Sequence, residues 1–427
     1  MKKTIKMSEI HTFTVAPGVE LWWLPTTKFH IARLEVNFLT PQHLPETTAR
    51  KMLANLLQRS SAEWPTEALL SRQLAGLYGA ELVARTTILQ NLNILSVAIS
   101  SALEYQQQEI FESAQQLLWN CLWRPNLDEQ QQQFAANAFK IEQVNLNHAY
   151  ESIADDYPLQ ASLALRRLVY QNVRDLAIPA FGTLEQLQQL TPIQVRQQYD
   201  NLLKNNRIIV TLVGAVSTKT VQKVLTALQN FSPRQQKFAF RIKDLKSNSP
   251  KPLQQTKIEP LQQSQLALAY QTSGRWSVLQ VLNMMFGGDD QSLLFQQVRE
   301  HHGLAYSIYS NVNTYQQLIY VQAGVDGSQV SLTETLIKQQ IVRLTQENLT
   351  ELLHHAQLAL INQRLELADT IAVSANRLLL KALNPQAIID DQQYIQEIKR
   401  VQLADVQAAT QQLHKIAGYY LIGQDKE

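Results

Sequence analysis

The chain has 427 residues, more than a single hydrophobic core of roughly 250–300 residues can use, so we expect two domains or more. Its 38 basic and 36 acidic residues nearly balance, and the basic residues are scattered, so nothing indicates a surface built for nucleic acid or membrane. No apolar stretch follows the lysines of the N-terminal MKKTIKMSEIHTF, and no uncharged apolar run reaches about 18 residues, so we expect neither a secretory signal nor a transmembrane helix. Cys121 is the only cysteine, which excludes an intrachain disulfide and is typical of a reducing compartment. We therefore expect a cytoplasmic protein.

The first half of the chain predicts helices and strands in a definite order. TTARKMLANLL (47–57) has helical periodicity, and SRQLAGLYGAELVARTT (71–87) predicts a helix that leads into a strand. NLNILSVAIS (91–100) alternates as a strand does, and YQQQEIFESAQQLL (105–118) has the apolar spacing of an amphipathic helix. After a long helical stretch, RIIVTLVGAV (207–216) predicts the closing strand.

The second half repeats this order. A helix (275–287) precedes a helix-to-strand segment (293–310), and a strand (316–326) and an amphipathic helix (330–344) follow. GYYLIGQ (418–424) matches the closing strand. The offset is roughly 225 residues, which is the size of a domain and exceeds the short-period repeat classes. The sequence therefore predicts two copies of one α+β unit, each a mostly antiparallel or mixed sheet with helices packed on one face.

A polar, proline-containing stretch separates the two copies. Pro233, Pro250 and Pro252 flank or interrupt it, and it contains the run KSNSPKP, a composition that resists packing. We therefore predict a first unit over residues 1–233, a linker over 234–256 and a second unit over 257–427.

The segment FGGDDQSLLFQQVREHHGLAYSIYS, from Phe286 to Ser310, contains the most specific motif. It resembles the C-terminal half of the insulinase/pitrilysin (inverzincin) metallopeptidases, which include the mitochondrial processing peptidase. In that family small residues or glycines precede a helix with an arginine, and a tyrosine follows seven residues later at the start of a strand. Arg299 and Tyr306 have this spacing, and Gly287 and Gly288 precede them.

The resemblance implies that Arg299 and Tyr306 hydrogen-bond the backbone carbonyls of an extended substrate peptide, and that Gly287 and Gly288 shape its approach. A structural interpretation stays open beside this one. On spacing alone, Arg299 is a charge on a helix surface, Tyr306 a half-buried strand residue, and the glycines a helix C-cap followed by a turn.

Catalysis in this family needs the motif H-x-x-E-H on the first long helix, and a third carboxylate ligand from a helix roughly 75 residues further on. The ending QRSSAEWPT (58–66) resembles the end of the family's motif helix and assigns the three motif positions to Lys51, Ala54 and Asn55. None of the three can bind zinc, and residues 131–138, where the third ligand is expected, contain no Asp or Glu. We therefore predict a degenerate zinc site, with no metal and no other cofactor in this chain.

Two pairs of adjacent histidines, His301–His302 and His354–His355, are the remaining candidates for a metal site. Neighbours on a helix point about 100° apart and rarely share a metal, so surface or capping roles are expected. A minor part in peptide binding stays open for the first pair, which lies beside Arg299.

The resemblance extends over nearly the whole chain and is greatest to the bacterial YmfF-type proteins, a branch without the zinc motif. It implies a non-catalytic, substrate-binding subunit of a two-subunit zinc peptidase that acts on small peptides or unfolded segments, with zinc only in an H-x-x-E-H-bearing partner. The alternative is a peptidase-derived scaffolding protein, a homodimer without proteolytic role. A third possibility is that the chain is itself a zinc peptidase with ligands not recognised in its sequence.

Overall fold

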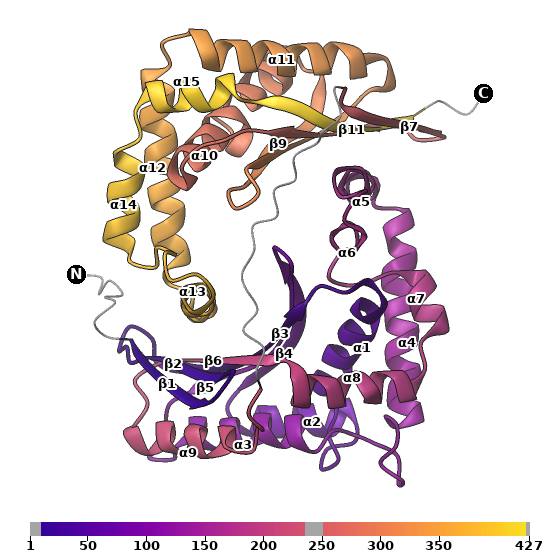
Figure 1. Cartoon of the computed structure of the whole chain (residues 1–427), viewed down its shortest axis with the longest axis vertical. Coiled ribbons are helices and arrows are strands. Elements are labelled where there is room, and N and C mark those ends of the chain that lie inside the picture. Colours follow the sequence, from indigo (N-terminus) through magenta and orange to yellow (C-terminus); the bar gives the residue numbers. More distant parts are fainter. Residues whose placement is uncertain (1–9, 235–250, 424–427) are drawn as a thin grey trace. The chain divides into compact units, whose positions relative to one another are not determined.

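The computed structural model describes residues 10–234 and 251–423. The chain forms two compact units, and each draws on both halves of the sequence (Figure 1). Residues 151–178 belong to the unit of the second half, and residues 367–391 belong to the unit of the first half. Among the described residues, unit 1 comprises 10–150, 179–234 and 367–391; unit 2 comprises 151–178, 251–366 and 392–423.

These units differ from the contiguous ranges 1–233 and 257–427 at the two exchanged helical segments. Each segment belongs to the unit whose sheet buries its apolar residues, and periodicity within a segment does not encode that choice. Of the expected linker, 234–256, residues 235–250 lie outside the described residues, and its last residues begin the first strand of unit 2.

Unit 1 contains a six-stranded sheet in the order β1-β2-β6-β3-β5-β4. β2 and β6 are parallel, and the other neighbouring strands are antiparallel. β3 and β5 are buried along most of their length because they are central and helices cover both faces of the sheet. The strands are β1 (His11–Ala16), β2 (Val19–Leu24), β3 (Ile31–Pro41), β4 (Glu81–Leu89), β5 (Leu92–Ala102) and β6 (Arg207–Val213).

One face of this sheet packs against α1 and α3, and the other packs against α13 (Figure 1). Leu379 and Leu383 of α13 join a cluster with Leu39, Leu92 and Ile209 of the strands. The helices of unit 1 are η2 (Leu44–Glu46), α1 (Thr47–Arg59), α2 (Glu67–Gly76), α3 (Ile110–Trp123), α4 (Ala136–Glu151), α7 (Leu184–Gln189), α8 (Pro192–Asn205), α9 (Thr218–Leu228) and α13 (Ile371–Leu383).

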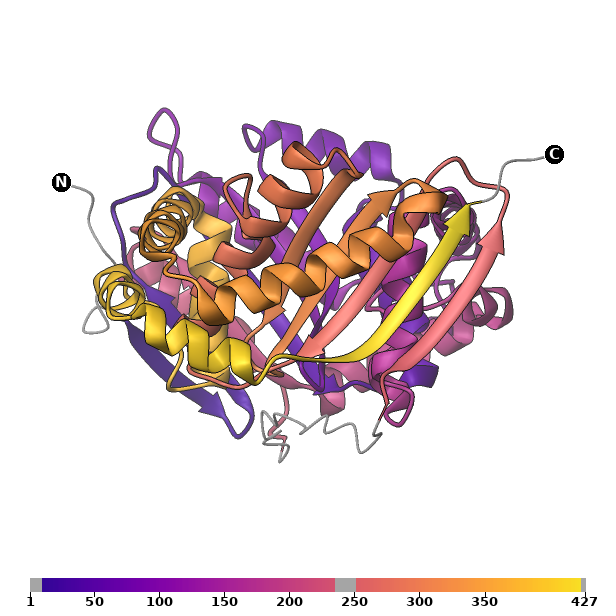
Figure 2. The same ribbon diagram turned by 90° about the horizontal axis from the view of Figure 1, so that it is seen from above.

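Unit 2 contains a five-stranded sheet in the order β7-β11-β8-β10-β9, in which only β7 and β11 are parallel. Figure 2 shows β11, in yellow, beside β7. The strands are β7 (Leu253–Glu259), β8 (Ser264–Gln271), β9 (Ala305–Asn313), β10 (Leu318–Val325) and β11 (His414–Gly423).

Helices also cover both faces of the unit 2 sheet (Figure 1). α5 packs on β8 and β11, where Ala161 and Leu165 meet Ala267, Tyr419 and Leu421, while α11 and α15 lie side by side on the opposite face. The helices are η3 (Ser152–Ala154), α5 (Tyr157–Val169), α6 (Arg174–Ala177), α10 (Trp276–Asn283), η4 (Met284–Gly288), η5 (Phe295–His301), η6 (Gly327–Gln329), α11 (Val330–Gln346), α12 (Thr350–Leu367), α14 (Asp391–Lys399) and α15 (Leu403–Gln411).

The second sheet repeats the first without β1. β7, β11, β8, β10 and β9 take the places of β2, β6, β3, β5 and β4, and the single parallel pair is the corresponding one in both sheets. The predicted α+β class with two related, mostly antiparallel sheets is therefore confirmed. Each sheet also has a helix on the face that was expected to carry none: α13 in unit 1 and α5 in unit 2.

Several helices begin where a side chain can cap the first turn. Thr66 and Ser217 accept hydrogen bonds from backbone N–H groups three residues further on, at the starts of α2 and α9. α8 begins at Pro192 behind a capping box, in which Thr191 and Gln194 each accept the other's backbone N–H. Among the described residues, no helix has the length and apolarity needed to cross a membrane.

Cys121 lies inside α3 with none of its surface exposed, and burial raises the pKa of its thiol to about 12. We expect no reaction with a thiol reagent at pH 8 in the native protein and one equivalent of reaction in denaturant, because only the thiolate reacts. Between about pH 9 and 12 the native thiol keeps a proton that the unfolded chain loses, so the free energy of unfolding should fall as pH rises. Rapid stoichiometric labelling of the native protein would contradict this placement.

Candidate functional site

Arg299 and Tyr306 lie at either side of a tight connection from η5 to β9 in unit 2. The helix ends at His301, and the chain turns at Gly303, whose φ of +61° lies in the left-handed region. Two hydrogen bonds close the turn: Gly303 N–H donates to the Arg299 carbonyl at 3.0 Å, and Leu304 N–H donates to the Val298 carbonyl at 3.0 Å. The connection holds the backbone of Arg299 at a defined position relative to the start of β9.

Tyr306 occupies a β-bulge at the start of β9. Ser307 pairs with Gly324 and Ala305 pairs with Val325, so Tyr306 is the extra residue between two consecutive pairs. A bulge turns a side chain away from the regular alternation of the strand. Tyr306 is 70% exposed, and β9 is one of the two outer strands of its sheet.

The Arg299 side chain is partly exposed, with 44% of its surface accessible. Its guanidinium lies over the Phe295 ring, 4.7 Å from the centroid, and its nearest ion-pair contact is Glu300 at 3.8 Å. This separation is too long for a hydrogen bond, so the planar donor set of Arg299 keeps capacity for another acceptor. η5 and η4 are both π-helical, a rare geometry that often marks functional sites.

Gly287 and Gly288 lie in η4, where the chain packs closely against β9. A Cβ on Gly287 would lie 2.8 Å from Ser310 Oγ and 2.9 Å from the Ser310 backbone nitrogen. Asn283 also contacts Ser310, whose Oγ donates a hydrogen bond to Asn283 Oδ1 at 2.9 Å. The Gly287 φ of −161° is extended backbone, so the need for glycine here is steric. Gly287 is buried and Gly288 is partly buried.

We expect Gly287→Ala to lower the free energy of unfolding by about 1–3 kcal/mol, because the added methyl group meets backbone that cannot move aside. Gly76→Ala is the control, since a Cβ there meets nothing within 4 Å at the end of α2. Denaturant unfolding measures both. Equal stability of the two variants would show that η4 does not press on β9.

The three degenerate zinc-motif positions lie on α1 in unit 1. Ala54 is fully buried, and Lys51 and Asn55 are partly buried. Asn55 Nδ2 donates to Glu142 Oε2 at 3.0 Å, and Glu142 lies on α4, the helix that faces this part of α1. Glu142 also has an electrostatic interaction with Lys51. A carboxylate therefore faces motif positions 51 and 55, as a third ligand would.

Sequence reasoning missed Glu142. The expected spacing places the third ligand at 131–138, but a loop closed by the Leu127–Phe134 bridge precedes α4, which begins only at Ala136. The available signal was a single glutamate on the apolar face of α4, between the buried residues Phe139 and Leu146.

The residues at this site do not fit zinc. Glu142 is 3% exposed and forms an ion pair with Arg59, which also binds Glu67. Burial lowers the pKa of Lys51, and the nearby Glu142 partly offsets this effect. One carboxylate already neutralised by a guanidinium, beside an amide and a lysine, cannot supply the three ligands of a zinc peptidase. Within the described residues, no group of three or more His, Cys, Asp or Glu side chains could hold a metal.

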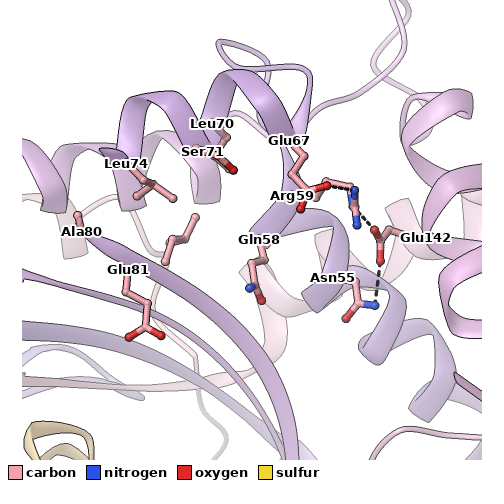
Figure 3. A pocket seen from close by; sticks show the side chains of 11 residues that line it. Asn55, Gln58, Arg59, Glu67, Leu70, Ser71, Leu74, Ala80, Glu81 and Glu142 are labelled. Atoms are coloured by element: carbon pink, nitrogen blue, oxygen red, sulfur yellow. Dashed lines mark hydrogen bonds and ion pairs between the residues drawn. The ribbon is translucent and has the colours of Figure 1, made fainter. Parts of the chain in front are cut away.

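A pocket of about 450 Å³ lies beside this cluster, between α1, α2, α4 and the start of β4. Figure 3 shows Glu142, Asn55 and Arg59 linked on one side, with Glu81 on the other side and Gln58 between them. The remaining lining residues are Glu67, Leu70, Ser71, Leu74, Ala80 and Leu82.

The comparisons with known proteins agree with this arrangement. Residues 189–359 match the family described as peptidase M16 inactive domain. The chain is 24% identical to the probable inactive metalloprotease YmfF of Bacillus subtilis, over 95% of this chain and 96% of the relative. It superposes on a conserved protein from Enterococcus faecalis with a TM-score of 0.91 at 27% identity, covering 98% of this chain and 100% of the other. A peptidase M16 inactive domain from Pseudomonas fluorescens shares the fold, with a TM-score of 0.78 at 15% identity over 98% of this chain and all of the other.

The family match falls across the end of the first half and the segment that contains Arg299 and Tyr306, and the relative named above is described as inactive. The absence of zinc ligands at 51, 54 and 55 is consistent with that description. The two-unit fold, the matched family model and the full-length relative together show that this chain resembles the inactive homologues of the peptidase M16 family over nearly its whole length.

Proposed function

We propose that the chain is the non-catalytic, substrate-binding subunit of a two-subunit zinc peptidase that acts on small peptides or unfolded segments. The observation that carries this proposal is Tyr306, which a bulge exposes at the start of the outer strand β9, close in the chain to the partly free guanidinium of Arg299. Exposing a tyrosine to this degree forgoes the burial that a core position would give it, so a binding role explains its placement best.

The chemistry of this pair suits a peptide backbone. The Arg299 guanidinium and the Tyr306 hydroxyl both donate hydrogen bonds, and the carbonyls of an extended peptide accept them. β9 is paired with β10 on one side only, and a peptide can add to such an outer strand. Gly287 supports the pair indirectly, because it allows η4 to pack closely against β9.

Hydrolysis must come from another polypeptide in this proposal, since the zinc positions of this chain hold Lys51, Ala54 and Asn55. The partner is a subunit of similar size that carries H-x-x-E-H and the zinc ion. This chain would hold the substrate across the partner's metal site.

Purification of the tagged protein from its own host tests the proposal, with zinc content and peptide cleavage as the readouts. Recovery of an H-x-x-E-H-bearing partner, with zinc and cleavage in the complex but not in this chain alone, is the expected result. A zinc-free homodimer without cleavage would overturn the proposal and support the scaffolding alternative.

A further inference from the structure

β4, one of the two outer strands of the unit 1 sheet, has backbone groups directed away from the sheet. Ala84 N–H donates a hydrogen bond to a side chain outside the sheet, so the backbone groups of Ala84 face away from β5. Backbone groups alternate along an antiparallel strand, so those of Leu82 and Thr86 face outward as well. These three residues form the open edge of the sheet, the part that another strand would need for pairing.

Gln58 of α1 closes the middle of this edge. Its Oε1 accepts a hydrogen bond from Ala84 N–H at 3.0 Å. The acceptor is a carboxamide oxygen, the same chemical group as the backbone carbonyl that an added strand would place there. Gln58 thus satisfies the donor that an incoming strand would use.

The edge is also covered at Thr86, the next outward-facing residue after Ala84. Thr86 Oγ1 donates to the Ala180 carbonyl at 2.9 Å. Thr183 N–H donates to Thr48 Oγ1 on α1 at 3.0 Å, and a Cβ on Gly182 would overlap Thr48. The loop from Pro179 to Thr183 is therefore fixed against α1 while it meets Thr86, and it narrows access from that end.

Access from the other end is open. The pocket of about 450 Å³ is lined by Leu82, the next outward-facing residue of β4, and by Gln58. Gln58 itself is exposed, so its side chain can leave Ala84 without unpacking the core. A segment that enters from the pocket and pairs with Leu82 meets the Gln58–Ala84 hydrogen bond at the next outward-facing residue.

We infer that Gln58 is a built-in competitor that keeps the outer edge of unit 1 from adding a strand. The segment it excludes is an extended peptide or chain end whose backbone carbonyl would take the place of Gln58 Oε1 on Ala84 N–H. The inference concerns this chain by itself and goes beyond the proposed function, which assigns substrate binding to β9. The two sheet edges then differ: β9 presents Tyr306, while β4 is closed by the chain's own side chain.

Hydrogen exchange at residue resolution tests the hydrogen bond. Gln58→Ala removes the acceptor, and we expect the Ala84 amide to exchange at least about 10-fold faster, with little change at Val83 and Arg85, which pair with β5. Gln58→Glu keeps an acceptor oxygen at the same reach and should retain protection. Gln222→Ala, at an exposed glutamine of α9, is the control for losing a carboxamide. Equal exchange of Ala84 in all variants would overturn the inference.

Peptide binding to the isolated chain tests the consequence. A fluorescein-labelled extended peptide of about ten residues should bind Gln58→Ala at least about 10-fold more tightly than wild type or Gln58→Glu, and its analogue with alternate backbone nitrogens methylated should lose that gain. No gain, or a gain that methylation leaves intact, would overturn it. Neither measurement involves a partner or cleavage. Failure of the proposed two-subunit function would leave these results standing, and unchanged Ala84 exchange would leave the proposed function standing.

Discussion

Arg299→Ala is expected to lower kcat/KM for peptide cleavage by the reconstituted two-subunit enzyme about 100-fold, and Tyr306→Phe about 10-fold. A charge-assisted hydrogen bond to a substrate carbonyl contributes about 1.5–3 kcal/mol, whereas a neutral hydroxyl contributes about 0.5–1.5 kcal/mol. A misplaced scissile bond adds to both losses. Both side chains are substantially exposed, so the free energy of unfolding should change by no more than about 0.5 kcal/mol.

Matched variants separate this effect from a general change of surface. Arg275→Ala removes an exposed arginine of unit 2, and Tyr309→Phe removes a hydroxyl on the same strand that already donates to Gln322 at 2.8 Å. Both controls should cleave peptides within about twofold of wild type. If Arg299→Ala and Tyr306→Phe behave like these controls, the role proposed for the pair is wrong, although the complex itself could still form.

The second large effect concerns Arg50, a fully buried arginine at the centre of unit 1. Arg50→Met is expected to lower the free energy of unfolding by about 3–5 kcal/mol, because it leaves three buried acceptors unpaired at a cost of about 1–3 kcal/mol each. The guanidinium donates to Asn93 Oδ1 at 2.8 Å, Asn206 Oδ1 at 2.7 Å and the Phe38 carbonyl at 3.0 Å. Methionine preserves the length of the side chain but leaves these buried acceptors without their donors.

Arg50 remains charged at neutral pH, although burial lowers the pKa of its guanidinium to about 10. Arg50→Lys should lose less stability than Arg50→Met, because one ammonium can satisfy part of the acceptor set. Arg72→Met, at an exposed position of α2, is the control and should stay within about 0.5 kcal/mol of wild type. Denaturant unfolding followed by the reactivity of Cys121, which lies in the same unit, measures the three variants. A loss below about 1 kcal/mol in Arg50→Met would contradict the role of this network.

The order of the elements could be read from the sequence because it depends on short-range periodicity. Apolar residues recur with period 2 in the strand NLNILSVAIS and with period 3.6 in the helix TTARKMLANLL. In both segments this periodicity indicates which face is buried. The repeat follows from comparing these orders. The missing zinc ligands were equally accessible, because the side chains at 51, 54 and 55 decide metal chemistry whatever surrounds them.

Contacts between distant segments could not be read in the same way. Counting residues placed the third carboxylate near 131–138, but the loop before α4 adds residues without moving the helix away from α1, so the carboxylate is Glu142. The exposure of Tyr306 depends on a bulge, which is a mismatch between two strands and has no signature in either strand alone.

By itself, then, the sequence determined that the chain contains two related α+β units, that the first half has no zinc ligands at positions 51, 54 and 55, and that the second half has the Arg299–Tyr306 spacing. Only the tertiary structure decided that α13 completes the first sheet and α5 the second, that Glu142 pairs with Arg59, and that Gln58 caps Ala84. The physical reason is the range of the interactions. The periodicity of a segment indicates which of its faces is buried. The sheet, charged group or backbone donor that this buried face contacts depends on residues tens to hundreds of positions away in the sequence.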